Sequence, residues 1–280
     1  MGRTENAEIF RNTEKLYKNN AMLKESVANS INKQKLVLEG EQLPDIEKNL
    51  YEEPAKLVVS KKRSYEAAQG YKGQKVCVHN FASASNPGGG VVNGASAQEE
   101  CLCRCSTLYP CLSTDELRKK FYEPHRRAHD PIHNDDIIYT PDVTVFKTDT
   151  ANPILMDEED WYQVNVVTCA APNLRAVPSN SYNSGDGNKS VKVSDKELQA
   201  IHEKRLRRIL DVALMNGDEV VILGAFGCGA FMNDPYVVAR ACKTVIAEYR
   251  KAFKVIEFAV YCSPRDDKNF RVFEATMKGR

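Results

Sequence analysis

The sequence predicts an α/β fold with a mixed or mostly parallel sheet flanked by helices, preceded by a helical N-terminal segment. From residue 57 onward, short runs of β-branched residues alternate with longer segments of helical periodicity. This alternation is typical of α/β domains. The strand-like runs are largely apolar on both faces, which indicates a sheet covered by helices on both sides.

The predicted elements follow in chain order. Residues 4–19 carry an apolar stripe with helical spacing, and residues 20–56 are broken by Gly40, Pro44 and Pro54 into helix and loop. The expected strands are 57–60, 76–81, 143–146, 164–170, 220–225 and 256–261. The expected helices are 64–70, 97–108, 114–123, 195–216, 235–252 and 267–278. Residues 176–194, rich in Ser, Asn, Gly and Lys, are expected to form a surface loop. We therefore divide the chain into an N-terminal helical extension packed on the core, residues 1–56, and an α/β domain, residues 57–280.

Composition narrows the class of protein. The 39 Lys and Arg residues nearly balance the 38 Asp and Glu residues, which leaves a net charge of +1 and no basic field for sequence-specific nucleic-acid binding. No apolar run approaches the ~18 residues that a membrane span needs. The polar N-terminus lacks the apolar core of a secretory signal. Nine cysteines, an odd number in a chain of this length, favour reduced thiols and a cytoplasmic location.

Three consecutive glycines, Gly88–Gly90, follow the predicted strand 76–81 after a short link. Glycines adopt positive φ and leave room for a ligand to approach the backbone, although most such loops are ordinary turns. After seven further residues the chain reads Gln98-Glu99-Glu100. Neighbouring carboxylates raise one another's pKa, and a glutamic acid that stays protonated near neutral pH can protonate a leaving oxygen.

Glu99 also has a structural interpretation. Ser96 and Glu99 fit a capping box at the start of a helix beginning near Ala97. Taken alone, this spacing favours a cap. A ligand role remains the alternative.

A second glycine loop, residues 224–231, follows the strand-like run 220–223 and precedes a helix, with Asp234 as the expected N-cap and Pro235 at the first helical position. A strand, a glycine loop and a helix N-terminus together can hold a diphosphate. The glycine order is neither that of the dinucleotide-binding fingerprint nor that of the P-loop. The sequence therefore supports neither a nicotinamide-dinucleotide site nor a Walker ATPase.

Cys101, Cys103 and Cys105, with Cys111 beyond, raise the possibility of zinc. Their C-x-C spacing does not match structural zinc sites, and no second Cys or His pair follows at the usual distance. We therefore expect buried or half-buried thiols, no metal and no cofactor.

Three histidines and two charged runs are the remaining candidate functional segments. The histidines recur every four residues in a stretch that contains Pro124 and Pro131, which indicates a polar loop, with metal or substrate contact as the alternative. The basic run 204–208 and the acidic run 157–160 are expected to face solvent, because neither carries the aromatic residues of a nucleic-acid platform. The histidines are His125, His129 and His133.

Together these segments resemble the bacterial-type poly(ADP-ribose) glycohydrolases, whose domain is a macrodomain variant. The resemblance rests on residues 80–90, on Gln98-Glu99-Glu100 and on 104–110, and continues through 168–173, 224–231 and 233–235. It extends from the N-terminal helix to about residue 265. The glycine triplet and the Gln-Glu-Glu sequence at this gap are far more specific together than apart. Two segments depart from the family pattern, the cysteine-rich run 101–111 and the long loop 176–194. Neither of them alters the glycine triplet or the Gln-Glu-Glu sequence.

The resemblance implies a macrodomain-like mixed sheet and roles at matching positions. Glu100 is expected to be the catalytic acid/base, and Glu99 to hold the ribose hydroxyls beside the scissile bond. Residues 88–90 would face the ribose, and residues 227–231 would wrap the diphosphate, with Phe231 packed on the bound ribose. The implied substrate-binding residues are Asn80, Gly88, Gly89, Gly90, Gln98, Gly227, Cys228, Gly229, Ala230 and Phe231.

The implied activity is hydrolysis of the ribose–ribose O-glycosidic bonds of poly(ADP-ribose), with ADP-ribose as the product ligand and no metal or cofactor. The partners would be the polymer or ADP-ribosylated protein, without a membrane. Two alternatives stay open. A non-catalytic ADP-ribose-binding domain would not need Glu100, and a mono-ADP-ribosyl hydrolase would act on protein or nucleic acid. The preferred linkage and the mode of attack, exo or endo, depend on loop shape.

Overall fold

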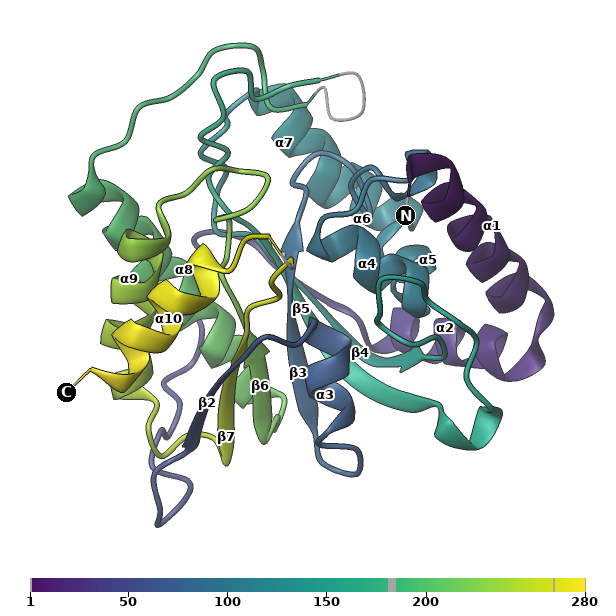
Figure 1. Cartoon of the computed structure of the whole chain (residues 1–280), viewed down its shortest axis with the longest axis horizontal. Helices are drawn as coiled ribbons and strands as arrows, with labels where there is room; N and C mark the ends of the chain where they lie inside the picture. The colour runs from purple at the N-terminus through teal and green to yellow at the C-terminus, as the bar shows by residue number, and fades with distance from the viewer. Residues whose placement is uncertain (1, 181–184, 264, 280) are drawn as a thin grey trace.

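A seven-stranded mixed sheet forms the centre of the computed structural model, which describes residues 2–180, 185–263 and 265–279 (Figure 1). The strand order is β1-β4-β5-β3-β6-β7-β2. Strands β5, β3, β6, β7 and β2 run parallel, whereas β4 is antiparallel to both β5 and β1. The strands are β1 (Lys35–Val37), β2 (Lys56–Ser60), β3 (Val76–Ala82), β4 (Ile137–Val145), β5 (Tyr162–Ala170), β6 (Val220–Leu223) and β7 (Val255–Ala259). The predicted mixed sheet is confirmed.

Helices cover both faces of the sheet (Figure 1). Successive strand residues point to opposite faces, so Val76 and Val78 join one core and Cys77 the other. Helices α8, α9 and α10 pack on the Cys77 side, and α3, α4 and α5 on the opposite side. The helices are α1 (Arg3–Asn19), α2 (Ala21–Lys33), α3 (Ser64–Gln69), α4 (Gln98–Cys105), α5 (Leu108–Leu112), α6 (Asp115–Leu117), α7 (Glu123–Ala128), α8 (Asp195–Met215), α9 (Pro235–Glu248) and α10 (Lys268–Lys278).

The N-terminal segment packs on the α4 side of the molecule (Figure 1). The predicted helix 4–19 is confirmed as α1, which is fixed to α4 because the Thr13 hydroxyl donates to the Arg104 carbonyl (2.6 Å). Residues 20–56 contain the short edge strand β1 as well as the expected helix and loop. The division of the chain after residue 56 stays a prediction.

Two predicted helices are interrupted. The expected helix 97–108 divides into α4 and α5 because Ser106 is extended (φ −147°) and its hydroxyl donates to the Leu102 carbonyl and accepts from the Leu108 N–H. Such local side-chain bonds compete with the helical ladder. The expected helix 114–123 becomes α6, one π-helical turn over Arg118–Tyr122 and α7. Residues 176–180 and 185–194 form no helix or strand, as expected; residues 181–184 of that loop lie outside the described residues.

The prediction that the basic run 204–208 faces solvent is wrong at Arg205, which is 2% exposed. Its guanidinium donates to Asp135 (2.9 Å) and to three backbone carbonyls, those of Ile132, His133 and Ala170. This arginine therefore connects α8 to the segment before β4 and to the end of β5. The acidic run 157–160 is exposed, as expected.

Across the part of the chain that the structure describes, no helix combines the length and the apolar character needed to span a bilayer.

Candidate active site

The candidate site lies where the parallel strands β3, β6 and β7 end. Their carboxyl ends meet at one edge of the sheet, the usual place for ligands in open α/β sheets. The loops that follow β3 and β6 carry the two predicted glycine segments, and the chain after β7 passes beside them. These loops line a cavity of about 770 Å³. Its volume is in the upper part of the range of small-molecule sites, ~300–1,000 Å³.

The glycine triplet folds back against the carboxylates of α4. Gly88 and Gly89 have positive φ, +66° and +58°. This backbone path brings the Gly90 N–H to Glu100 Oε1, to which it donates at 2.9 Å. The other oxygen of Glu100, Oε2, is buried and has no hydrogen-bond partner among the residues that the structure describes. The carboxyl group is therefore held at one oxygen and unsatisfied at the other.

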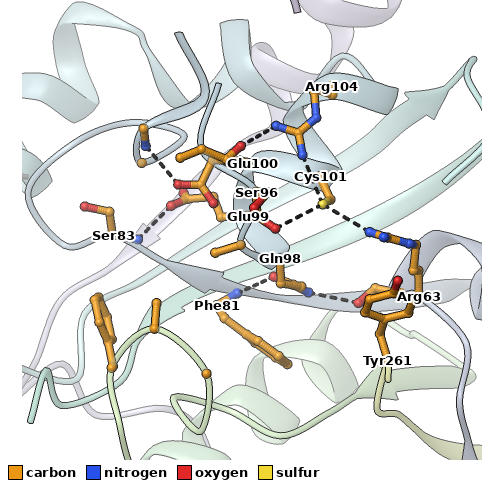
Figure 2. A pocket seen from close by; sticks show the side chains of 18 of the residues that line it. Arg63, Phe81, Ser83, Ser96, Gln98, Glu99, Glu100, Cys101, Arg104 and Tyr261 are labelled. Atoms are coloured by element: carbon orange, nitrogen blue, oxygen red, sulfur yellow. Dashed lines mark hydrogen bonds between the residues drawn. The ribbon is translucent and has the colours of Figure 1, made fainter. Parts of the chain in front are cut away.

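Glu99 points toward the end of β3. The Ser83 N–H donates to Glu99 Oε2 (2.7 Å), and the Asn80 amide donates to Glu99 Oε1 (3.3 Å) and to the Thr168 hydroxyl (3.2 Å). Figure 2 shows Glu99 and Glu100 beside one another in the first turn of α4. The N-cap of α4 is Ala97 and has no side-chain cap. The capping-box interpretation of Ser96 and Glu99 is therefore wrong, because the side chain of Glu99 is used elsewhere.

Burial sets the protonation of this pair. Glu99 and Glu100 are 2% and 7% exposed. Burial raises the pKa of Glu99 well above its ordinary value, and the neighbouring Glu100 raises it further. Burial also raises the pKa of Glu100, although the Gly90 N–H and the Arg104 guanidinium offset part of this effect. The protonated form of each carboxyl is thus favoured relative to an exposed glutamate.

Gln98 connects three segments of the site. Its side-chain oxygen accepts from the Phe81 N–H (2.9 Å) (Figure 2). Its amide donates to the His79 carbonyl (2.8 Å) and the Ser64 hydroxyl (3.0 Å). These bonds fix the start of α4 against β3 and α3. The orientation of the two carboxylates that follow depends on this anchor.

The second glycine loop presents backbone donors. In the described structure, the N–H groups of Gly229, Ala230 and Phe231 donate to no protein atom. All three residues line the cavity, together with Gly227, whose φ is +76°. Successive backbone N–H groups without a protein acceptor can bind an anion.

The helix after this loop begins as predicted. The Asp234 carboxylate accepts from the Tyr236 N–H (2.8 Å), and Pro235 occupies the first turn of α9. Both predictions for this helix start are confirmed.

Not every predicted site residue reaches the cavity. Gly89, Gly90, Gln98, Glu99 and Glu100 line it, as do Gly227, Gly229, Ala230 and Phe231. Asn80 is fully buried behind Glu99. Gly88 packs against Tyr109 and Cys103, and the Cys228 thiol turns toward the Phe226 carbonyl (3.7 Å). These three residues shape the walls from behind.

The far end of the cavity carries residues that the sequence analysis missed. Tyr261 follows β7, and the guanidinium of Arg63 lies 4.0 Å from the centre of its ring. Arg63 also donates to the Cys101 thiol (3.3 Å) (Figure 2). Inspecting the first residues after each parallel strand would have singled out Tyr261. Arg63 gives no such signal, since it stands between two elements in a generally charged stretch.

The histidine prediction is wrong in part. His125 lies in α7 and His133 is likewise buried, so the two do not belong to an exposed polar loop. His133 Nδ1 is 2.8 Å from the Ala171 carbonyl, and its Nε2 is 3.3 Å from Asp186.

The predicted burial of the cysteine run is confirmed, since Cys101, Cys103, Cys105 and Cys111 are all buried. Within the described residues, no group of three or more His, Cys, Asp or Glu side chains is placed to hold a metal ion.

Comparison with known proteins identifies a family and solved structures that this chain resembles. Residues 5–148 match the family model "Microbial-type PARG, catalytic domain". The chain is 28% identical to poly(ADP-ribose) glycohydrolase (PARG) from Thermomonospora curvata, with a TM-score of 0.79 over 98% of this chain and 99% of that one. The same enzyme bound to the inhibitor ADP-HPD gives 28% identity and a TM-score of 0.77 over 96% and 98% of the two chains.

A second bacterial enzyme is similarly close. Poly(ADP-ribose) glycohydrolase from Deinococcus radiodurans in complex with ADP-ribose is 30% identical, with a TM-score of 0.74 over 90% of this chain and 97% of that one. A search of the curated proteins gives no match. The family model covers more than half of the chain, and the structural matches cover nearly all of it. The chain therefore belongs to the family of microbial-type poly(ADP-ribose) glycohydrolases.

Proposed function

We propose that this poly(ADP-ribose) glycohydrolase cleaves the ribose–ribose O-glycosidic bond with Glu100 as general acid and then general base. The placement of Glu100 carries this proposal. Its carboxyl is buried, one oxygen accepts from the Gly90 N–H, and the other has no partner beside the cavity. Burial raises its pKa, which favours the protonated form that an acid catalyst requires.

In the first step, Glu100 protonates the ribose oxygen of the departing unit as the bond to the terminal ribose breaks. Positive charge develops on that ribose, as in other glycoside hydrolases. The Glu100 carboxylate then takes a proton from water, and the resulting hydroxide adds to the same carbon. The products are ADP-ribose and a polymer shortened by one unit, and Glu100 regains its proton.

Glu99 positions the terminal ribose in this scheme. Its two oxygens are already oriented by Asn80 and by the Ser83 N–H. Each oxygen keeps further acceptor capacity for a ribose hydroxyl. Because the raised pKa of Glu99 has burial as its first cause and Glu100 as its second, the pair is expected to titrate together rather than as two independent acids.

The loop 227–231 would hold the diphosphate of the terminal unit. The unpaired N–H groups of Gly229, Ala230 and Phe231 support this assignment. They neutralise an anion without side-chain charge, which agrees with a net charge of only +1. Phe231 would pack on the bound ribose, and the ring of Tyr261 offers a flat surface for the base. The complex of the Deinococcus radiodurans enzyme with ADP-ribose supports the same ligand here.

The scheme uses protein groups and water alone. It fits the cytoplasmic location that we expect, where all nine cysteines would persist as the free thiols of the structure.

The experiment is product analysis with two substrates, poly(ADP-ribose) of defined length and mono-ADP-ribosylated protein. We expect free ADP-ribose from the polymer and much slower release from the modified protein. Rapid release from the protein alone would favour a mono-ADP-ribosyl hydrolase. Binding of ADP-ribose without release from either substrate would favour a non-catalytic binding domain.

A further inference from the structure

The cavity extends past the carboxylates to a second wall, which we name the α1 wall. The start of α1 and the segment after β4 form it. It contains no residue of the 227–231 segment. Its lining residues are Arg3, Asn6, Asp149, Thr150, Ala151 and Pro153.

The position of Arg3 in this wall is fixed by packing. The Asn6 amide donates to the Gly94 carbonyl (3.1 Å). Gly94 has a φ of +73°, and a Cβ atom there would collide with the Arg3 carbonyl. The first turn of α1 therefore rests directly on the loop that connects the glycine triplet to Glu100. This contact keeps the Arg3 side chain at the edge of the active site.

Two buried polar atoms near this wall lack protein partners. Arg104 is 2% exposed and Asp149 is 6% exposed. Within the described part of the chain, Arg104 Nε donates to no atom and Asp149 Oδ1 accepts from none. Both residues line the cavity, as does Glu100 with its unpaired Oε2. Buried polar groups are normally satisfied, so a donor and two acceptors left without partners around one cavity indicate a polar ligand.

The charge of this region suits an anion. Figure 2 shows Arg63, Cys101 and Arg104 in a row on one side of the glutamate pair, with Ser83 on the other side. Arg3 adds a third guanidinium to the lining of the cavity. Guanidinium groups bind phosphate oxygens with charge-assisted hydrogen bonds. Because residues 229–231 offer backbone donors for the terminal diphosphate, these arginines suit a second anionic group.

We propose that the α1 wall is the subsite for the leaving ADP-ribose unit of the polymer. The inference rests on the proposed function. The ribose oxygen that Glu100 protonates belongs to the neighbouring ADP-ribose unit of the polymer. That unit must therefore lie beside Glu100, and it carries a diphosphate of its own. The α1 wall would bind that diphosphate through Arg3 and hold the leaving unit in line with the acid. A polymer would then be a better substrate than a glycoside with a small leaving group.

A steric test uses two neighbouring residues after β4. Ala151 is exposed and lines the cavity, whereas Asn152 is exposed and does not. Each is replaced by Trp in the full chain, and kcat/KM is measured for poly(ADP-ribose) and for 4-nitrophenyl ADP-ribose, which has the same terminal unit and a small leaving group. We expect Ala151→Trp to lower kcat/KM for the polymer at least tenfold and to leave the nitrophenyl substrate within twofold. Asn152→Trp should change neither.

A charge test uses two arginines of α1. Arg3 lines the cavity, and Arg11 faces solvent near Glu8 on the same helix. Arg3→Glu should lower kcat/KM for the polymer about tenfold, as expected for the loss of one charge-assisted contact. It should also reduce the salt dependence of polymer cleavage. Arg11→Glu, the same charge change on the same helix, should leave both substrates and the salt dependence unchanged.

The subsite and the proposed function fail under different outcomes. An equal loss on both substrates in Arg3→Glu and Ala151→Trp would overturn the subsite, since those residues would then act on the terminal unit or on the fold. Unchanged polymer cleavage in both variants would overturn it as well. If the wild-type chain cleaves neither substrate, the proposed function itself fails, independently of any variant.

Discussion

A Cβ atom placed on Gly89 would lie 2.5 Å from Glu100 Oε1 and 3.2 Å from Glu99 Oε2. The glycine loop and the two carboxylates are therefore fitted to one another with no room for a methyl group. We expect Gly89→Ala to push the Glu100 carboxyl out of place and to lower polymer turnover roughly 10²-fold, the loss associated with a ~1 Å misplacement of a catalytic group. Single-turnover digestion of the polymer measures the effect.

Gly40→Ala is the matched control for this substitution. Gly40 also has a positive φ, +84°, but a Cβ there would meet no atom within 4 Å. Both substitutions strain the backbone by about 1–2 kcal/mol, so both should lower thermal stability. Only Gly89→Ala should lower turnover of the folded protein. Wild-type turnover in Gly89→Ala would mean that the carboxylate position is not critical.

Glu100→Gln tests the catalytic acid. Glutamine keeps the shape of the side chain and can still accept from the Gly90 N–H, but it cannot give up a proton. We expect turnover of poly(ADP-ribose) to fall by roughly 10² or more, in line with the usual contribution of general acid–base catalysis. Affinity for free ADP-ribose, measured by calorimetric titration, should change by less than about tenfold, or ~1.4 kcal/mol.

Glu99→Gln is the comparison within the pair. Because Glu99 would bind the ribose hydroxyls, its replacement should weaken ADP-ribose binding as well as turnover. If Glu100→Gln digests the polymer at the wild-type rate, Glu100 is not the acid, and a binding role for the domain becomes the better explanation.

Much of the fold could be predicted because local patterns and tertiary packing agree. The apolar strands and the long amphipathic helix α8 are buried as their spacing indicates. The helix start at Asp234 and Pro235 follows from capping preferences alone. The glycine triplet and the glutamate pair meet in the structure because one follows β3 and the other opens the next α-helix, which packs back on that strand.

The wrong predictions share a physical cause. Each concerns a side chain whose hydrogen-bond partners are distant in the sequence. Glu99 fits a local capping box, yet its partners are Ser83 and Asn80. Arg205 sits in a basic run, yet it is buried against Asp135 and three carbonyls. Residues such as Arg63 gain their significance only from the cavity that they line, which no spacing along the chain reveals.

Gly229 should tolerate no bulky side chain for a different reason from Gly89. A Cβ atom on Gly229 would meet nothing within 4 Å, because it would stand in open space beside the cavity. Gly229→Val should therefore fold normally while its side chain blocks the proposed diphosphate position, so ADP-ribose binding should be lost. The thermal midpoint without ligand serves as the control for folding. Near-wild-type affinity in a folded Gly229→Val protein would contradict the assignment of this loop.

Arg205 is expected to matter for stability. Its replacement by Gln would leave Asp135 without its buried partner and would remove the guanidinium donor from three carbonyls. Breaking a buried ion pair from one side costs about 3–5 kcal/mol, and urea unfolding measures that loss. Arg207→Gln is the control, because Arg207 pairs with Glu248 at the surface, where such pairs contribute about 0–1 kcal/mol. Equal losses in the two variants would contradict the structural role of Arg205.

Asp149 makes stability depend on pH. Burial raises the pKa of its carboxyl from 3.8 to about 6, and the Arg63 guanidinium offsets part of that rise. Since the folded chain holds this proton more tightly than the unfolded chain, the stabilisation is complete below pH 3.8 and is lost as the pH rises through 6. Asp149→Asn keeps an acceptor for the Tyr65 N–H (3.0 Å) and cannot ionise. The unfolding free energy of Asp149→Asn should therefore rise relative to that of the wild type by roughly 2 kcal/mol between pH 4 and pH 7. Asp157→Asn, at an exposed site, is the control and should show no such rise. Parallel pH profiles of stability for the wild type and Asp149→Asn would contradict the raised pKa of Asp149.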